Sequence, residues 1–193
     1  MLTANFMKHR FFNSLILMVL LAIRAHAVQM EPLSIDELTA KSDAILKGRV
    51  ESLTTFKDDQ GRILTKVILN VQEVWKGPVS TNHFTIVLAG GILGDEKTVV
   101  SGQVQYLPGE DIIAFLVLNQ RGEGVTLGLV QGKFNVHTDS TSGLQTVHSR
   151  FHGRKPDSRP ASARISTQAV VSLSDDLTLD SLKEKVSGRK DSK

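Results

Sequence analysis

The sequence predicts a mainly β protein: a small antiparallel barrel, preceded by a short helix and followed, after a flexible linker, by a C-terminal helix. Apolar and polar residues alternate in several short runs between residues 44 and 136, and turn-forming residues separate these runs. Such a pattern is typical of closed or partly closed β-barrels. Further along, the apolar residues at 177, 179, 182 and 186 have the spacing of one helical face. An open sandwich of two sheets is the alternative to a barrel.

A short helix is predicted to begin at Ser34, near the N-terminal end of the barrel domain. Ser34 can cap the helix, and Glu37 follows three residues later, as in a capping box. Leu33 and Leu38 have the spacing of a hydrophobic staple. The helix is expected to end near residues 42–43.

The strands of the barrel are expected where apolar residues alternate or run together. We expect strands over residues 44–53, 63–75, 84–88, 111–118, 125–130 and 134–136. The segment 111–118 is apolar at nearly every position, which indicates burial on both faces. Asp-Asp-Gln-Gly at 58–61 and Arg-Gly-Glu-Gly at 121–124 supply turns between strands.

Residues 1–27 are predicted to form a secretory signal peptide. Lys8 and Arg10 precede an apolar run over residues 11–23, and Ala-His-Ala at 25–27 fits a small-x-small cleavage site. The run is shorter than the roughly 20 apolar residues of a membrane span. Because Arg24 lies between the run and the cleavage site, an uncleaved anchor remains the alternative. We expect an exported protein, periplasmic or extracellular, with membrane contact only through this peptide.

The rest of the chain divides into three predicted parts. Residues 28–136 form the β-barrel domain, residues 137–168 a flexible linker, and residues 169–193 a C-terminal helical tail. The linker is rich in Ser, Thr, Arg and Pro and has almost no apolar pattern. Such segments bury too little surface to offset the entropy lost on ordering.

Composition excludes several classes of function. The chain has 23 Lys and Arg and 20 Asp and Glu, but the three basic residues before residue 28 belong to the predicted signal peptide, so the remainder is neutral. Nucleic-acid binding needs a persistent basic face, and none is predicted. Trp75, Tyr106 and Phe84 could stack on single-stranded nucleic acid, but packing in the core or rim is favoured. With no cysteine, disulfides and thiol chemistry are excluded.

The connection over residues 89–105 is the predicted ligand surface, because long connections in a compact domain are often functional or mobile. The candidate ligand residues are Gly90, Gly91, Gly94, Asp95 and Glu96. The segment lacks the Gly-Lys-Ser/Thr end of a P-loop and the spacing of a dinucleotide fingerprint. Adjacent glycines at a strand end more often mark a bend at a barrel corner.

No catalytic residue, cofactor or metal site is predicted. No Gly-x-Ser-x-Gly elbow occurs, and His83 is the only histidine within the predicted barrel domain, residues 28–136. His148 and His152 have the spacing of two ligands on a helix, but they lie in the predicted linker, where solvated side chains are favoured. An exported enzyme using Asp95 and Glu96 with His83 is the alternative.

Four short motifs carry a resemblance to known proteins. They are SDAILKGRV at 42–50, KGP at 76–78, LPGED at 107–111 and QGKF at 131–134. This layout resembles a group of exported bacterial proteins of no assigned activity. It also resembles the netrin module and the tissue inhibitors of metalloproteinases, which implies an OB-like barrel over about residues 42–136.

The resemblance carries over no site residue. The metalloproteinase inhibitors act through an N-terminal cysteine, whereas the predicted mature N-terminus of this chain is Val28. A protease-inhibitor-like module acting through that terminus remains a further candidate. The leading prediction is an exported, non-catalytic binding or interaction domain of the cell envelope, with an unknown protein or envelope ligand as its partner.

Overall fold

The computed structural model describes residues 32–153 and 177–188, which belong to one compact unit, Pro32–Lys193. The predicted signal peptide and residues 154–176 lie outside the described residues. Neither helix within the described ranges has the length and apolar character needed to cross a membrane.

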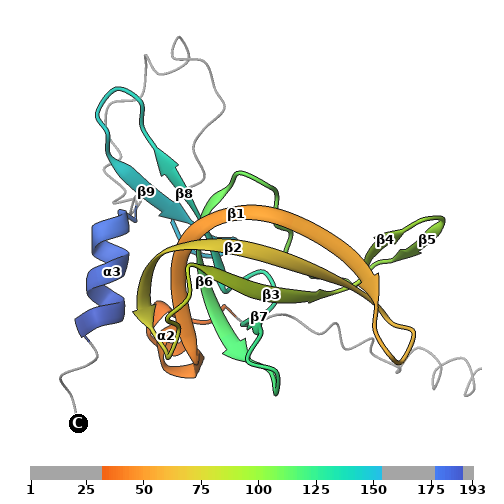
Figure 1. Ribbon diagram of the computed structural model, residues 1–193. Helices are drawn as coiled ribbons and strands as arrows, with labels where there is room; N and C mark the ends of the chain where they lie inside the picture. Colours follow the sequence, from red (N-terminus) through yellow and green to blue (C-terminus); the bar gives the residue numbers. More distant parts are fainter. Residues whose placement is uncertain (1–31, 154–176, 189–193) are drawn as a thin grey trace, which may run out of the picture. The chain divides into compact units, whose positions relative to one another are not determined.

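Five strands form a closed barrel (Figure 1). They are β1 (Ala44–Lys57), β2 (Ile63–Lys76), β3 (His83–Ala89), β6 (Asp111–Leu118) and β7 (Gly124–Thr126). Their order is β1-β2-β3-β7-β6, and β6 pairs back with β1 to close the ring. All these pairings are antiparallel except the short parallel pairing of β3 with β7. The predicted fold class, a mainly β protein with an OB-like barrel and a helix near each end, is confirmed.

The alternation of side chains along the strands divides the core into two clusters. In β6, Ile112, Ala114 and Leu116 point into the barrel, whereas Ile113 and Phe115 pack outside it. All five are fully buried, so the predicted burial of this strand on both faces is confirmed. The two clusters explain why β6 is apolar at successive positions, while a strand with one solvated face alternates.

The helix α2 (Ile35–Lys41) begins as predicted. The Ser34 side chain accepts a hydrogen bond from the Glu37 backbone, and the Glu37 side chain accepts one from the Ser34 backbone at 2.9 Å. This is the complete capping box. Leu38 is fully buried in the outer cluster, where it packs with Ile45 and Phe115.

The start of the predicted linker is folded, which corrects the sequence prediction for residues 137–153. Strand β8 (Lys133–Thr138) pairs with β6 and with β9 (Gln145–His148), so a hairpin extends the sheet. Val147 is buried in the outer cluster. Polar residues fix the turn: the Asp139 carboxylate accepts hydrogen bonds from the backbones of Thr141 and Ser142. A composition that suggested disorder therefore encodes a polar hairpin turn.

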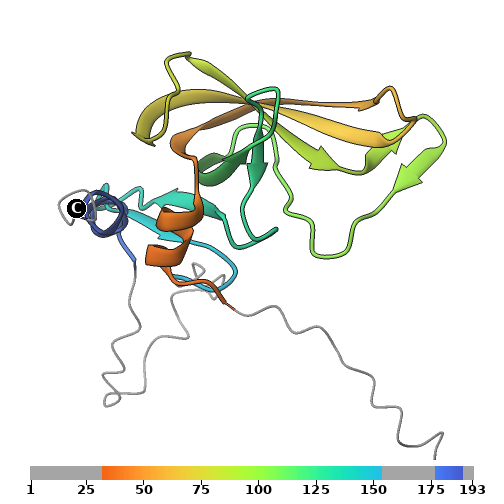
Figure 2. The same cartoon turned by 90° about the horizontal axis from the view of Figure 1, so that it is seen from below.

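The C-terminal helix α3 (Leu179–Ser187) packs on the outside of the barrel (Figures 1 and 2). Leu179, Leu182 and Val186 are buried, and Leu177 precedes them in the same cluster, as the predicted helical face required. Thr178 caps the helix by accepting a hydrogen bond from the Ser181 backbone at 3.1 Å. The helix is thus part of the fold and covers the outer cluster.

A charged group on β2 also holds α3. The Glu73 carboxylate accepts hydrogen bonds from Lys183 of α3 at 2.6 Å and from Lys47 of β1 at 2.8 Å. Trp75 donates a third at 3.1 Å. The Lys183 bond, the Lys47 bond and then the Trp75 bond lower the pKa of Glu73 to about 2.

We predict that Glu73→Gln lowers the free energy of unfolding at pH 7 by about 1–2 kcal/mol, allowing for solvent screening of this partly exposed group. A lowered carboxyl pKa stabilises the fold above the unfolded value of 4.5, and the effect is lost as the pH falls towards 2. Urea unfolding of both proteins across this range should show the difference vanishing at the acid end. Glu184→Gln, at an exposed position of α3, is the control. A difference that persists at pH 2 would contradict this explanation.

Candidate functional site

The predicted ligand segment, residues 89–105, contains a small hairpin where the sequence predicted a long connection. Strands β4 (Gly91–Leu93) and β5 (Glu96–Thr98) pair with each other and form a separate two-stranded sheet. A connection over residues 99–110 then leads to β6. Figures 1 and 2 show the hairpin at the opposite end of the barrel from α3.

Two glycines bend the chain where it leaves β3. Gly90 and Gly91 have φ angles of 86° and 142°, a region that favours glycine. A Cβ atom on Gly91 would lie 2.5 Å from the Thr65 hydroxyl oxygen and 2.8 Å from Thr55. The Thr65 hydroxyl also donates a hydrogen bond to the Gly90 carbonyl at 2.7 Å. The hairpin is therefore seated directly against β1 and β2.

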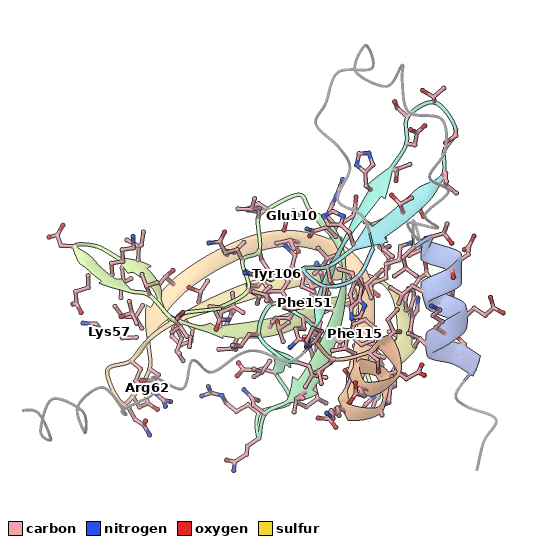
Figure 3. The ribbon with its side chains drawn as sticks, turned by 180° about the vertical axis from the view of Figure 1, so that it is seen from behind. Lys57, Arg62, Tyr106, Glu110, Phe115 and Phe151 are labelled. Carbon is pink, nitrogen blue, oxygen red and sulfur yellow. The ribbon has the colours of Figure 1, made fainter. Side chains whose placement is uncertain are left out.

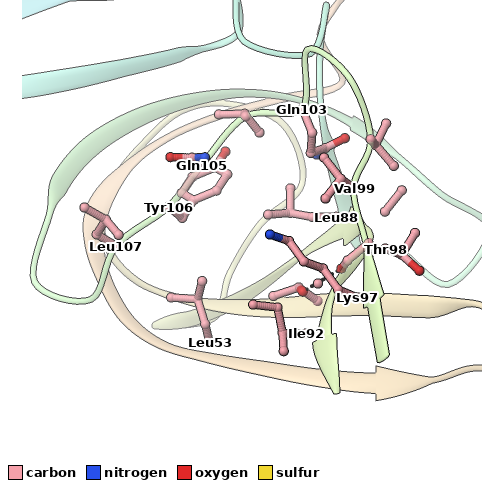
Figure 4. A pocket seen from close by; sticks show the side chains of 16 residues that line it. Leu53, Leu88, Ile92, Lys97, Thr98, Val99, Gln103, Gln105, Tyr106 and Leu107 are labelled. Atoms are coloured by element: carbon pink, nitrogen blue, oxygen red, sulfur yellow. Dashed lines mark hydrogen bonds between the residues drawn. The ribbon is translucent and has the colours of Figure 1, made fainter. Parts of the chain in front are cut away.

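An open pocket of about 300 Å³ lies between this hairpin, the connection that follows it and the barrel wall (Figure 4). Its lining is mainly apolar. The large apolar side chains that line it include Leu53, Leu88, Ile92, Val99, Val104 and Leu107. We call this the mouth pocket. Concave, mostly apolar sites with few polar groups are the usual form of small-ligand sites.

Three apolar side chains of the mouth pocket are exposed to solvent. Ile92 is 63% exposed, Val99 is 74% exposed and Leu107 is 59% exposed. Single exposed apolar residues are common on protein surfaces, but a group around a hollow indicates a binding surface. The three side chains come from β4, the connection after β5 and the turn before β6.

Lys97 is the charged residue of the mouth pocket. It pairs across the hairpin with Ile92, and Figure 4 shows its side chain extending over the pocket. Because side chains alternate along a strand, the adjacent Glu96 points to the other face, where it binds Lys57 at 2.6 Å. Within residues 32–153 and 177–188, no carboxylate lies within ion-pairing distance of Lys97.

The floor of the mouth pocket is fixed from inside the barrel. Tyr106 is 2% exposed, and its hydroxyl shares a hydrogen bond with the Thr126 hydroxyl at 2.7 Å. Burial raises the pKa of Tyr106 well above its ordinary range. The negative charge of Glu110, which Figure 3 labels together with Tyr106, raises this pKa further. The floor is therefore built from a side chain that stays neutral and stays in place.

A partly buried ion pair holds the connection over residues 99–110 in place. Lys133 donates to the Glu110 carboxylate at 2.5 Å and to the Gln105 carbonyl at 2.7 Å. Its ammonium group lies 4.9 Å from the centre of the Tyr106 ring. Desolvation lowers the pKa of Lys133. Sequence reasoning noted Lys133 only as part of the QGKF motif, because its partners Gln105 and Glu110 lie more than 20 residues away in the chain.

The five predicted ligand residues do not all lie at the mouth pocket. Gly90 and Gly91 line the mouth pocket, whereas Gly94 and Asp95 form the tip of the hairpin, away from it. Glu96 faces a neighbouring hollow on the other side of the hairpin. Sequence reasoning missed Lys97 and the exposed apolar side chains. Their signal was present, since apolar residues flank the polar β5 on both sides.

The residues of the alternative enzyme do not converge. His83, at the start of β3, lies 3.1 Å from the carboxylate of Glu51, whereas Glu96 lies beyond the other end of β3 and binds Lys57. No group of three metal-ligating side chains occurs in the described part of the chain. His152, a histidine of the predicted linker, contacts the Leu33 carbonyl at 2.6 Å and so joins the fold.

The three aromatic residues considered as a stacking platform are separate core residues. Phe84 and Tyr106 belong to the cluster inside the barrel, and Trp75 belongs to the outer cluster. All three are at most 9% exposed. The favoured prediction of core packing is confirmed.

Comparison with protein-family models gives no match for this chain, and comparison with curated proteins gives none either. The class of protein is therefore described by its structure: it is a closed five-strand β-barrel with a mainly apolar pocket at one end. The resemblance to the netrin module and the metalloproteinase inhibitors stays a prediction. The inhibitor hypothesis depends on Val28, which lies outside the described residues.

We predict that Gly91→Ala destabilises the protein by about 2–3 kcal/mol, because it adds a steric clash to a backbone conformation reserved for glycine. Gly94→Ala is the matched control: its φ is also positive, at 60°, but no atom lies within 4 Å of the added Cβ. Its expected cost is about 1 kcal/mol. Urea unfolding measures both. If both variants lost the same free energy of unfolding, the close packing of Gly91 against Thr65 would be contradicted.

Proposed function

We propose that this protein is an exported, non-catalytic binding domain of the cell envelope, and that the mouth pocket is its ligand site. The observation that carries the proposal is the exposure of Ile92, Val99 and Leu107 around a hollow of about 300 Å³. Keeping large apolar side chains in water is unfavourable, so a group of them around a concave site supports a binding role.

The polar groups near the mouth pocket support binding over catalysis. Thr65 is engaged with the Gly90 carbonyl, and Tyr106 is engaged with Thr126. Lys97 is exposed and forms no ion pair with an acid within the described ranges, because the adjacent Glu96 pairs with Lys57. General acid–base catalysis needs a titratable group in hydrogen-bond reach of a second group or of the substrate. The described lining provides mainly apolar contacts, the neutral polar side chains of Thr98, Gln103 and Gln105, and one positive charge.

The proposed site of action outside the cytoplasm rests on the N-terminal sequence. The basic segment, apolar run and Ala-His-Ala triplet of residues 1–27 have the order of a signal peptide. The absence of cysteine agrees with a fold that depends on apolar burial in any redox environment.

The proposal predicts a component of envelope extract whose retention depends on the mouth pocket. The protein is recovered from the exported fraction, where its mass should correspond to a chain beginning at Val28, and is immobilised. Wild-type protein, Leu107→Asp and Leu144→Asp are exposed to the same extract, and bound lipids, small molecules and proteins are identified by mass spectrometry. Leu144 is an apolar control, 52% exposed, in the turn between β8 and β9.

We expect Leu107→Asp to lower retention roughly tenfold or more, because a charge in an apolar site is costly to desolvate. Leu144→Asp should retain the component as the wild type does. Circular dichroism and thermal unfolding establish that both variants fold. Equal retention by all three proteins, or an exported chain that keeps residues 1–27, would contradict the corresponding part of the proposal.

A further inference from the structure

We propose that the ligand of the mouth pocket is a small apolar carboxylate: a single alkyl chain held by the apolar lining, with its acidic group at Lys97. This inference rests on the proposed function and names the ligand class of the same site. It follows from three properties of the mouth pocket: its size, its lining and its unbalanced charge.

Size favours a small molecule over a folded partner. The mouth pocket holds about 300 Å³, at the lower end of the roughly 300–1,000 Å³ typical of small-ligand sites. A stable protein interface buries about 800 Å² on each partner. The rim provides only three large apolar side chains that are more than half exposed, namely Ile92, Val99 and Leu107. A single chain can enter the hollow and cover all three.

The lining favours an alkyl chain. Leu53 and Leu88 from the barrel wall face the hairpin and the connection across the hollow (Figure 4). The aromatic floor, Tyr106, uses its hydroxyl inside the barrel, so its hydroxyl is already satisfied without a ligand. Thr98, Gln103 and Gln105 add neutral polar side chains to the lining, but most of the lining side chains are apolar. Such a lining matches a ligand with an alkyl chain.

The charge at the rim selects an anion. Lys97 and Ile92 lie on the same face of the hairpin because they are direct cross-strand partners. The neighbouring carboxylate of Glu96 is directed away from this face to Lys57. A ligand lying on Ile92 therefore brings its polar end to an ammonium group that has no acid beside it in the described residues. A carboxylate satisfies that group, a neutral alcohol does so weakly, and an amine is repelled.

Isothermal titration calorimetry tests the inference with defined probes. Straight-chain carboxylates from hexanoate to dodecanoate, each below its micelle concentration, are titrated into residues 28–193, which retain the whole compact unit. Decanol and decylamine are the neutral and cationic probes of fixed chain length. The variants are Lys97→Gln, Lys97→Arg and the control Lys185→Gln, an exposed lysine of α3.

We expect the dissociation constant to fall about fourfold per added methylene until the pocket is filled, and then to change little. Decanoate should bind up to about fivefold more tightly than decanol, the range of an exposed ion pair, and decylamine should bind weakest. Lys97→Gln should remove the preference for decanoate over decanol. Lys97→Arg and Lys185→Gln should keep it, and 0.5 M salt should reduce it through screening.

The outcomes separate this inference from the proposed function. If decanoate and decanol bind equally to the wild type, or if Lys97→Gln keeps the preference, the acidic ligand is wrong while the apolar site stands. If no probe binds but envelope extract yields a protein sensitive to Leu107→Asp, the small-molecule class is wrong and the binding domain stands. If no probe binds and no extract component depends on Leu107, both are wrong.

Discussion

The pairing of β1 with β6 is the interaction on which the rest of the structure depends. Residues Ala44–Arg49 of β1 pair with β6 on one edge, and residues 45–49 also pair with β2 on the other; this double pairing closes the sheet. Three irregularities of register in β1 allow the strand to curve. Gly48 lies among them, where a Cβ would collide with the Asn70 carbonyl of β2. A side chain at that position would hold β2 away and keep the barrel open.

Closure also creates the candidate site. Once β6 is paired with β1, the chain from β3 to β6 must cross one end of the barrel, and it does so with the β4–β5 hairpin and the connection over residues 99–110. Val104 and Tyr106 of this connection fill the barrel interior, while Val99 at its start and Leu107, just after Tyr106, remain exposed. The mouth pocket is the space between the β4–β5 hairpin, which stays outside the core, and the stretch around Val104 and Tyr106, which enters it. At the other end, α3 covers the outer cluster, so its apolar residues are not available to a ligand.

Local sequence signals predicted most of the fold because most of it is determined locally. The capping box of α2 and the helical spacing of α3 each depend on neighbours within a few residues, and both predictions hold. The doubly buried β6 was recognisable because burial on two faces removes alternation. The β8–β9 hairpin was missed because its turn depends on Asp139, whose hydrogen bonds leave no apolar pattern. The candidate site was predicted only as a segment: exposure of Ile92 and isolation of Lys97 follow from how the hairpin sits on Thr65, which no short stretch of sequence encodes.

Residue-resolved amide hydrogen exchange tests the closure of the barrel most directly. If β1 is the strand shared between β2 and β6, the amides within residues 45–49 of β1 exchange only through global unfolding, and their opening free energy equals that measured by urea. The amides of β5, in a hairpin held by one neighbour, exchange much faster. If the amides of residues 45–49 exchanged as fast as those of β5, the sheet would be open between β1 and β6. The mouth pocket would then not arise from closure of the barrel.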